Sequence, residues 1–117
     1  MTDLHPNCRL WIYSETRPGV FGDGKVRLLK ALAQHGSIQG AAQALGVSYR
    51  KAWGDLKKAE SCLQQRLARK IRGGRGGGRT ILTEQGKCLL QLFDRFRDNI
   101  NHQIQEQFET FIRELEK

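Results

Sequence analysis

Residues 37–63 read SIQGAAQALGVSYRKAWGDLKKAESCL, and this stretch decides the fold. Two helices are predicted over residues 38–45 and 49–63, because a serine stands in the capping position before each of them. Between them Gly46 permits the unusual backbone angle of a tight turn. A pair of alanines midway along the first helix lets the second helix approach closely. This spacing predicts a helix-turn-helix.

The second of these helices divides into a buried face and an exposed face. Apolar residues, among them Ala52 and Leu56, recur at helical spacing and anchor it to a core. In DNA-binding motifs of this shape, the exposed N-terminal residues of the second helix enter the major groove. There, Arg50 and Lys57 are placed to contact guanine edges or phosphates. The alternative is an ordinary helical hairpin with Trp53 buried. The candidate DNA contacts of this motif are Ser37, Gln39, Ser48, Tyr49, Arg50, Lys51, Trp53 and Lys57.

A segment rich in glycine and arginine follows the two helices. Residues 67–72 and 79–82 are predicted as short strands, joined by a tip that reads GGRGGG. Glycine lets the backbone lie close to a sugar-phosphate chain, and arginine is favoured electrostatically in a narrow minor groove. After a helix-turn-helix, a hairpin of this type is interpreted as a wing, with Arg72, Arg75 and Arg79 as candidate contacts. The alternative is a disordered hairpin tip with no part in binding.

The residues before the helix-turn-helix contain a strand and a further helix. Residues 8–15 alternate in a strand pattern, with Leu10 and Ile12 on one side and the two aromatic residues on the other. A loop rich in proline and glycine is predicted through residues 18–24. A helix is then expected over residues 25–35.

The C-terminal part of the chain is predicted to be one long helix. Thr83 can cap it, and at roughly 32 residues it spans about 48 Å. Its apolar stripe repeats about every 3.7 residues, above the 3.5 of a regular left-handed coiled coil. Burial against a second copy is expected, because so long a helix outruns the domain before it. Folding back onto its own domain is the alternative. The candidate dimer residues are Leu89, Phe93, Phe96, Ile100, Ile104, Phe108, Phe111 and Leu115.

Positive charge is concentrated in the predicted helix-turn-helix and wing. The 117 residues carry a net charge of +8. Residues 48–79 hold 10 basic residues against two acidic ones, whereas residues 83–117 hold 5 basic and 7 acidic residues. A surplus of this density favours a polyanionic partner.

Several classes of protein are excluded or disfavoured. No stretch approaches the roughly 18 apolar residues of a membrane-spanning helix, and the N-terminus has no secretory signal pattern, so a cytoplasmic location is expected. Three cysteines without a CxxC pair predict neither a disulfide framework nor a zinc site. The histidines are scattered and no catalytic arrangement is present, so neither an enzyme nor a cofactor is expected.

These motifs together resemble a known family. The runs GSIQGAA from Gly36 and GVSYRKAW from Gly46, the GGRGGG tip and the following LTEQGKCLL are similar to the N-terminal DNA-binding domain of ModE-type molybdate-responsive regulators. The resemblance covers roughly residues 8–95, and its last piece is shared with the wider LysR-like winged-helix group. It implies a dimeric protein that binds a palindromic operator. By this resemblance Ser48, Tyr49, Arg50 and Trp53 belong to the recognition helix and Arg75 to the wing.

One departure from the family pattern affects the expected signal. Family members that sense molybdate do so through C-terminal oxyanion-binding domains, and nothing up to Lys117 resembles one. We therefore expect a chain that does not bind molybdate by itself. A separate molybdate-sensing partner protein, another signal, or no signal then remain as alternatives.

The expected fold is mainly α with a small β-hairpin: a winged helix-turn-helix over residues 1–83, followed by a dimerisation helix over residues 84–117. The expected function is transcriptional regulation by a homodimer that binds a palindromic site in double-stranded DNA. A non-specific architectural DNA-binding protein and a winged-helix protein-interaction module are the alternatives.

Overall fold

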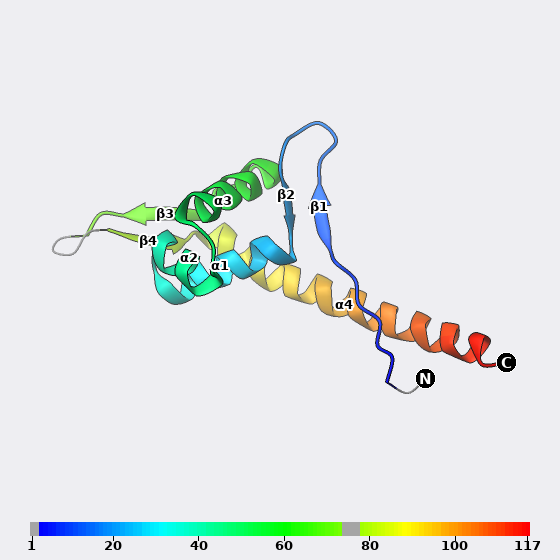
Figure 1. The fold of residues 1–117 in the computed structure, drawn as a ribbon. Helices are drawn as coiled ribbons and strands as arrows, with labels where there is room; N and C mark the ends of the chain where they lie inside the picture. The colour runs from blue at the N-terminus through cyan, green and yellow to red at the C-terminus, as the bar shows by residue number, and fades with distance from the viewer. Residues whose placement is uncertain (1–2, 74–77) are drawn as a thin grey trace.

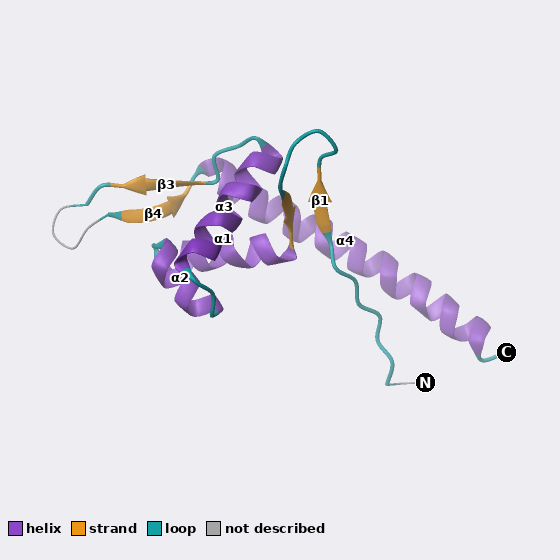
Figure 2. Cartoon of the chain, turned by 45° about the horizontal axis from the view of Figure 1, so that its top comes forward, coloured by secondary structure: helices purple, strands orange, loops and turns teal. Residues whose placement is uncertain are grey.

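The computed structural model describes residues 3–73 and 78–117. Three helices form a body, from which one hairpin and one long helix project in opposite directions, with a second hairpin beside the body (Figure 1). Figure 2 shows the two hairpins at opposite ends of the helical body. The elements are β1 (Trp11–Tyr13), β2 (Val20–Gly22), α1 (Asp23–His35), α2 (Ile38–Leu45), α3 (Tyr49–Leu63), β3 (Ala68–Ile71), β4 (Arg79–Leu82) and α4 (Glu84–Leu115).

Side-chain caps begin the helices where the sequence predicts them. The hydroxyls of Ser37, Ser48 and Thr83 accept hydrogen bonds from backbone N–H groups in the first turns of α2, α3 and α4. Gly36 and Gly46 end α1 and α2 in the left-handed conformation, with φ of 74° and 69°. The predicted bounds of α2 and α3 are confirmed, while α1 begins two residues earlier than predicted.

The region around β1 differs from its predicted form. The predicted strand over residues 8–15 is only three residues long, and the predicted loop over 18–24 contains the strand β2. The two strands pair antiparallel, with Ile12 opposite Phe21. Phe21 is fully buried, whereas all three residues of β1 are exposed. The predicted alternation therefore does not give β1 a buried side, because the hairpin reaches the core through its second strand.

The core is shared by the three-helix body, the two hairpins and the first part of α4. Its fully buried side chains include Phe21, Leu29, Leu32 and Leu67. Phe93 of α4 is 4% exposed and packs edge-on against Phe21, with ring centroids 5.3 Å apart. Beyond this contact α4 projects from the body, and the molecule extends 67 Å along its longest axis.

Two contacts fix the wing strands to the helical body. The buried carboxylate of Glu60 in α3 accepts hydrogen bonds from the backbone N–H groups of Leu67 (2.8 Å) and Ala68 (3.3 Å). The backbone N–H of Thr80 in β4 donates to the carbonyl oxygen of Gly36 at 2.8 Å. The orientation of the β3–β4 hairpin relative to α2 and α3 is therefore set by hydrogen bonds at both of its strands.

Candidate nucleic-acid interface

A groove lies where the N-terminal ends of α2 and α3 meet the wing strands. Its volume is about 460 Å³. It brings together five of the residues predicted to contact DNA, from three separate parts of the chain. They are Ser37, Gln39, Tyr49, Arg72 and Arg79, and the groove is completed by Ile38, Lys70, Ile71, Gly73, Gly78 and Thr80.

The exposed face of α3 continues this surface. Tyr49, Trp53 and Lys57 follow one another at intervals of four residues and so share one face of the helix. Tyr49 is 49% exposed and Trp53 is 44% exposed, so Trp53 is not buried as the ordinary helical hairpin requires. The ammonium group of Lys57 lies 5.5 Å from the centroid of the Trp53 ring. An aromatic and cationic face of this kind suits both base edges and phosphates.

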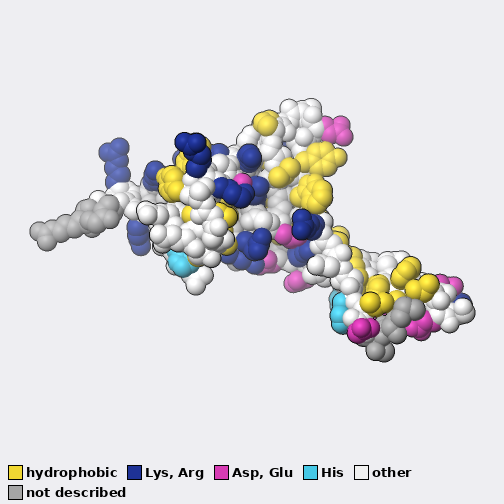
Figure 3. Space-filling view, viewed as in Figure 1, with side chains coloured by type: hydrophobic (Ala, Val, Ile, Leu, Met, Phe, Trp, Pro, Cys, Tyr) yellow, Lys and Arg dark blue, Asp and Glu magenta, His cyan; other side chains and the backbone are white. Residues whose placement is uncertain are grey.

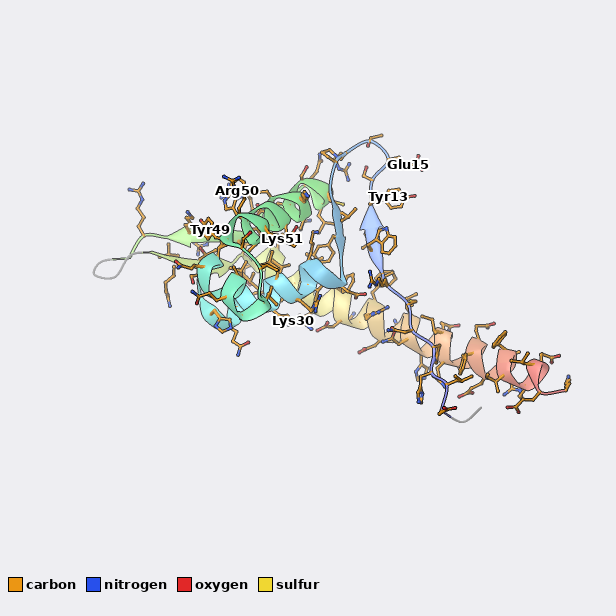
Figure 4. All side chains as sticks on the ribbon, viewed as in Figure 1. Tyr13, Glu15, Lys30, Tyr49, Arg50 and Lys51 are labelled. Atoms are coloured by element: carbon orange, nitrogen blue, oxygen red, sulfur yellow. The ribbon has the colours of Figure 1, made fainter. Side chains whose placement is uncertain are left out.

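Arg50 and Lys51 differ in whether they form an ion pair with another residue. Figure 4 shows Tyr49, Arg50 and Lys51 on the first turn of α3. Within residues 3–73 and 78–117, Arg50 makes no ion pair. Lys51, in contrast, pairs with the carboxylate of Asp55 at 3.0 Å. Arg50 is therefore the more available cation at this end of the helix.

The Asp55 carboxylate forms the negative centre of a small charge cluster. It pairs with Lys51 in its own helix and, at 3.5 Å, with Lys25 of α1. Partial burial alone would raise the pKa of Asp55, but the hydrogen bond from Lys51 and the charges of Lys25 and Lys51 outweigh burial and lower it. Asp55 is thus ionised at neutral pH, and it holds Lys51 on the flank of α3 that faces α1.

The wing contributes cations at its base. Arg72 and Arg79 are exposed on either side of the hairpin, whereas Arg75 lies outside the described residues. Lys70 also lines the groove and was not among the predicted contacts. Its signal in the sequence is its spacing: Lys70 and Arg72 are two residues apart, so in an extended strand both project to the same face.

The electrostatic character of the whole surface suits an anionic partner. Lys and Arg side chains gather over α3 and the wing, whereas Asp and Glu are more frequent toward the end of α4 (Figure 3). The N-terminal ends of two helices border the groove, and a helix N-terminus carries partial positive charge from the peptide dipoles. Ser37, which caps α2, lines the groove itself, and Ser48 caps α3 one residue before the lining residue Tyr49.

Comparison with known proteins identifies the family. Residues 24–87 match the family described as "Bacterial regulatory helix-turn-helix protein, lysR family". The chain belongs to this family. The match runs from α1 into the start of α4 and includes the whole groove. The LysR family consists of regulatory proteins and not of enzymes, as the sequence predicted.

The predicted resemblance to ModE-type regulators is also confirmed. The chain is 42% identical over 76 residues to the molybdenum-pterin-binding protein MopA of Rhodobacter capsulatus, a match that covers 65% of this chain and 28% of MopA. It is 35% identical over 105 residues to the transcriptional regulator ModE of Haemophilus influenzae, covering 86% of this chain and 41% of that protein. The chain thus spans well under half the length of these two relatives.

Solved structures confirm the winged-helix fold. The crystal structure of a CbnR_DBD-DNA complex superposes with a TM-score of 0.56 at 22% identity, covering 74% of this chain and 94% of that one. The crystal structure of ArgP from Mycobacterium tuberculosis gives a TM-score of 0.52 at 22% identity, covering 73% of this chain and 30% of that one. No helix among residues 3–73 and 78–117 of this LysR-family chain meets the length and hydropathy that crossing a membrane demands.

Proposed function

We propose that this DNA-binding transcriptional regulator of the LysR family recognises a specific sequence in double-stranded DNA, as a cytoplasmic homodimer on a palindromic site. The observation that carries the proposal is the shared surface of α3, the start of α2 and the wing base. One groove is lined by polar side chains from the start of α2 (Ser37 and Gln39), by an aromatic side chain from α3 (Tyr49) and by cations from the wing base (Lys70, Arg72 and Arg79). A helix inserted in the major groove reads base edges, while the flanking cations hold the phosphates.

The homodimer part of the proposal rests on α4. Phe93 is buried within the core of its own domain, and Leu89 is only partly buried against that core, so we leave Phe93 out of the proposed interface. Farther along, Phe96, Phe111 and Leu115 are 42%, 57% and 53% exposed. Exposed apolar residues along a projecting helix favour burial by a second copy. To read half-sites one helical turn apart, the two recognition helices of such a pair must lie about 34–36 Å apart.

Selection from a random duplex library at near-physiological salt tests this proposal directly. We expect an inverted repeat, which would demonstrate both sequence specificity and two-fold symmetry. Binders without a common motif would instead indicate a non-specific architectural protein. Failure to recover any binder would contradict DNA recognition and favour a protein-interaction module. Affinity for the recovered site should fall steeply with salt, because bound phosphates release counterions.

Two arginine variants separate base reading from backbone positioning. Arg50→Ala should weaken binding to the selected site by about 1–3 kcal/mol and relax the preference at one base position, if Arg50 reads a base edge. Arg75→Ala should weaken binding to all duplexes similarly, because a wing contact mainly positions the protein. Arg95→Ala, on the exposed part of α4, is the control. If both test variants bind DNA with the same affinity as wild type, the assignment of Arg50 and Arg75 as DNA contacts is wrong.

The names of the relatives raise the question of molybdate. The 117 residues match only 28% of MopA and 41% of ModE from Haemophilus influenzae, which leaves most of each relative's length for an oxyanion site outside the matched part. We therefore propose that these residues do not bind molybdate, and that a molybdate signal would reach them through a separate sensing partner. Isothermal titration of the 117-residue chain with molybdate should show no heat of binding at micromolar concentrations. Micromolar binding would refute this proposal.

A further inference from the structure

The β1–β2 hairpin presents an apolar face that the DNA-binding motif does not use. Trp11 and Tyr13 are 58% and 62% exposed, and Val20, which lies opposite Tyr13 in the hairpin, is 37% exposed. The hairpin precedes the residues that match the LysR family. It lies at the C-terminal end of α3, on the opposite side of the body from the wing (Figure 1). These side chains are therefore remote from the proposed DNA groove.

The hairpin is held firmly against the body, so its face has a fixed position. The guanidinium group of Arg17 donates two hydrogen bonds to the carbonyl oxygen of Cys62 at the end of α3, at 3.1 and 3.3 Å. A Cβ atom at Gly19 would lie 2.4 Å from the carbonyl oxygen of Lys58, so the hairpin backbone packs directly on α3. Such a surface can bind a partner without a large ordering cost.

A second apolar surface lies on the projecting part of α4. Phe111 and Leu115 are more than half exposed. Next to them, Ile104 and Phe108 line a hollow of about 420 Å³ together with Pro6 of the N-terminal segment. Figure 3 shows hydrophobic side chains on both sides of the notch between the hairpin and the projecting helix. The apolar surfaces of the hairpin and of α4 thus border one notch.

The charges around these two surfaces are complementary. Arg9, Lys25 and Arg27 line a groove at the base of the hairpin together with Trp11, and Asp23, which also lines it, is paired with Arg97 at 3.2 Å. Within residues 3–73 and 78–117, neither Arg9 nor Arg27 makes an ion pair. Residues 101–117 hold four acidic and two basic residues, and the C-terminal end of α4 carries the negative end of the helix dipole. An apolar, acidic helix end fits an apolar, basic hairpin face.

We infer that the hairpin face binds the C-terminal part of α4 from a second copy of this chain. The inference rests on the proposed homodimer and names the second half of its interface. In a two-fold dimer every contact occurs twice. Because the hairpin lies beside the body and α4 projects away from it, each helix end reaches the partner's hairpin when the two α4 helices run antiparallel. Trp11 and Tyr13 then supply the large aromatic anchors that commonly dominate the energy of an interface.

Sedimentation equilibrium of the full chain tests this inference. The double substitution Trp11→Ser and Tyr13→Ser should raise the dimer dissociation constant at least roughly tenfold. Leu92→Ser is the matched control, since Leu92 is 52% exposed but lies off the stripe of α4, and it should leave the constant within about twofold. If the wild type is dimeric and the double substitution does not weaken its association, the inference is overturned while the proposed homodimer stands. A monomeric wild type would overturn both.

Photo-crosslinking gives a second readout that does not depend on a loss of association. The variant Tyr13→p-benzoylphenylalanine is prepared in an unlabelled and an isotope-labelled form. The two forms are mixed and crosslinked, and the crosslinked peptides are mapped by mass spectrometry. We expect crosslinks that join the two isotopic forms and end within residues 104–117. Crosslinks confined to one isotopic form, or ending elsewhere on the partner, would overturn the inference.

Discussion

Phe93→Ala is expected to lower the free energy of unfolding by about 3–5 kcal/mol, the usual cost of removing a buried aromatic ring. Phe93 is 4% exposed and packs edge-on against Phe21, which is fully buried. The substitution leaves a cavity between α4 and the body, and few neighbours are free to fill it, because Phe21 is itself held in the short β1–β2 ladder.

Urea unfolding at one fixed protein concentration measures this effect, since association adds to apparent stability. Leu92→Ala is the control: it removes an exposed side chain from the same turn of α4 and should change stability by less than about 0.5 kcal/mol. If Phe93→Ala were no more destabilising than Leu92→Ala, the packing of α4 on the body would be wrong. A correct packing has a functional consequence, because the direction of α4 sets the spacing of the two recognition helices in the proposed dimer.

The case of Phe93 illustrates what periodicity in a sequence can and cannot predict. A stripe with a spacing of three and four residues correctly predicts one long helix with an apolar face. The spacing is the same whether that face packs on its own domain or on another chain. The division of the stripe between Phe93, buried in its own core, and Phe111, exposed, depends on where the body ends in space. No local pattern in the sequence records that boundary.

Elsewhere in the chain, features set by residues close in sequence were predictable, whereas features set by tertiary contacts were not. The first residues of α2 and α3 and the end of α2 were predictable because a serine hydroxyl and a left-handed glycine act on the backbone within a few residues. The C-terminal cap of α3, in contrast, is Gln64 in the left-handed conformation, with φ of 53°. Strand β2 was missed because its three residues are stabilised by pairing with β1 and by burial of Phe21, both of which are tertiary effects. Lys70 was missed as a groove residue for a related reason, since its role depends on the wing strands folding back toward Ser37.

The second large effect is expected at Glu60, which joins the recognition helix to the wing. Its Oε2 atom accepts both backbone hydrogen bonds, from Leu67 and Ala68, whereas its Oε1 atom lies 3.4 Å from the ammonium group of Lys57. Glu60→Ala leaves two buried N–H groups without an acceptor and should cost about 2–4 kcal/mol of stability. Glu60→Gln should cost less than about 1 kcal/mol, because an amide oxygen in the place of Oε2 keeps both bonds and only a partly exposed ion pair is lost.

The comparison of these two variants decides what the carboxylate contributes. Equal losses for alanine and glutamine would mean that the negative charge matters more than the two hydrogen bonds, contrary to the geometry. Lys57→Ala supplies the control for the ion pair and should change stability by less than about 1 kcal/mol.

The affinity of the folded variants for a DNA duplex is a second measurement. Glu60→Gln removes a negative charge beside the basic surface and should bind at least as tightly as wild type, whereas Glu60→Ala frees the wing base from α3 and should bind more weakly. Weaker binding by the alanine variant alone would show that the position of the wing, and not only its charge, contributes to recognition.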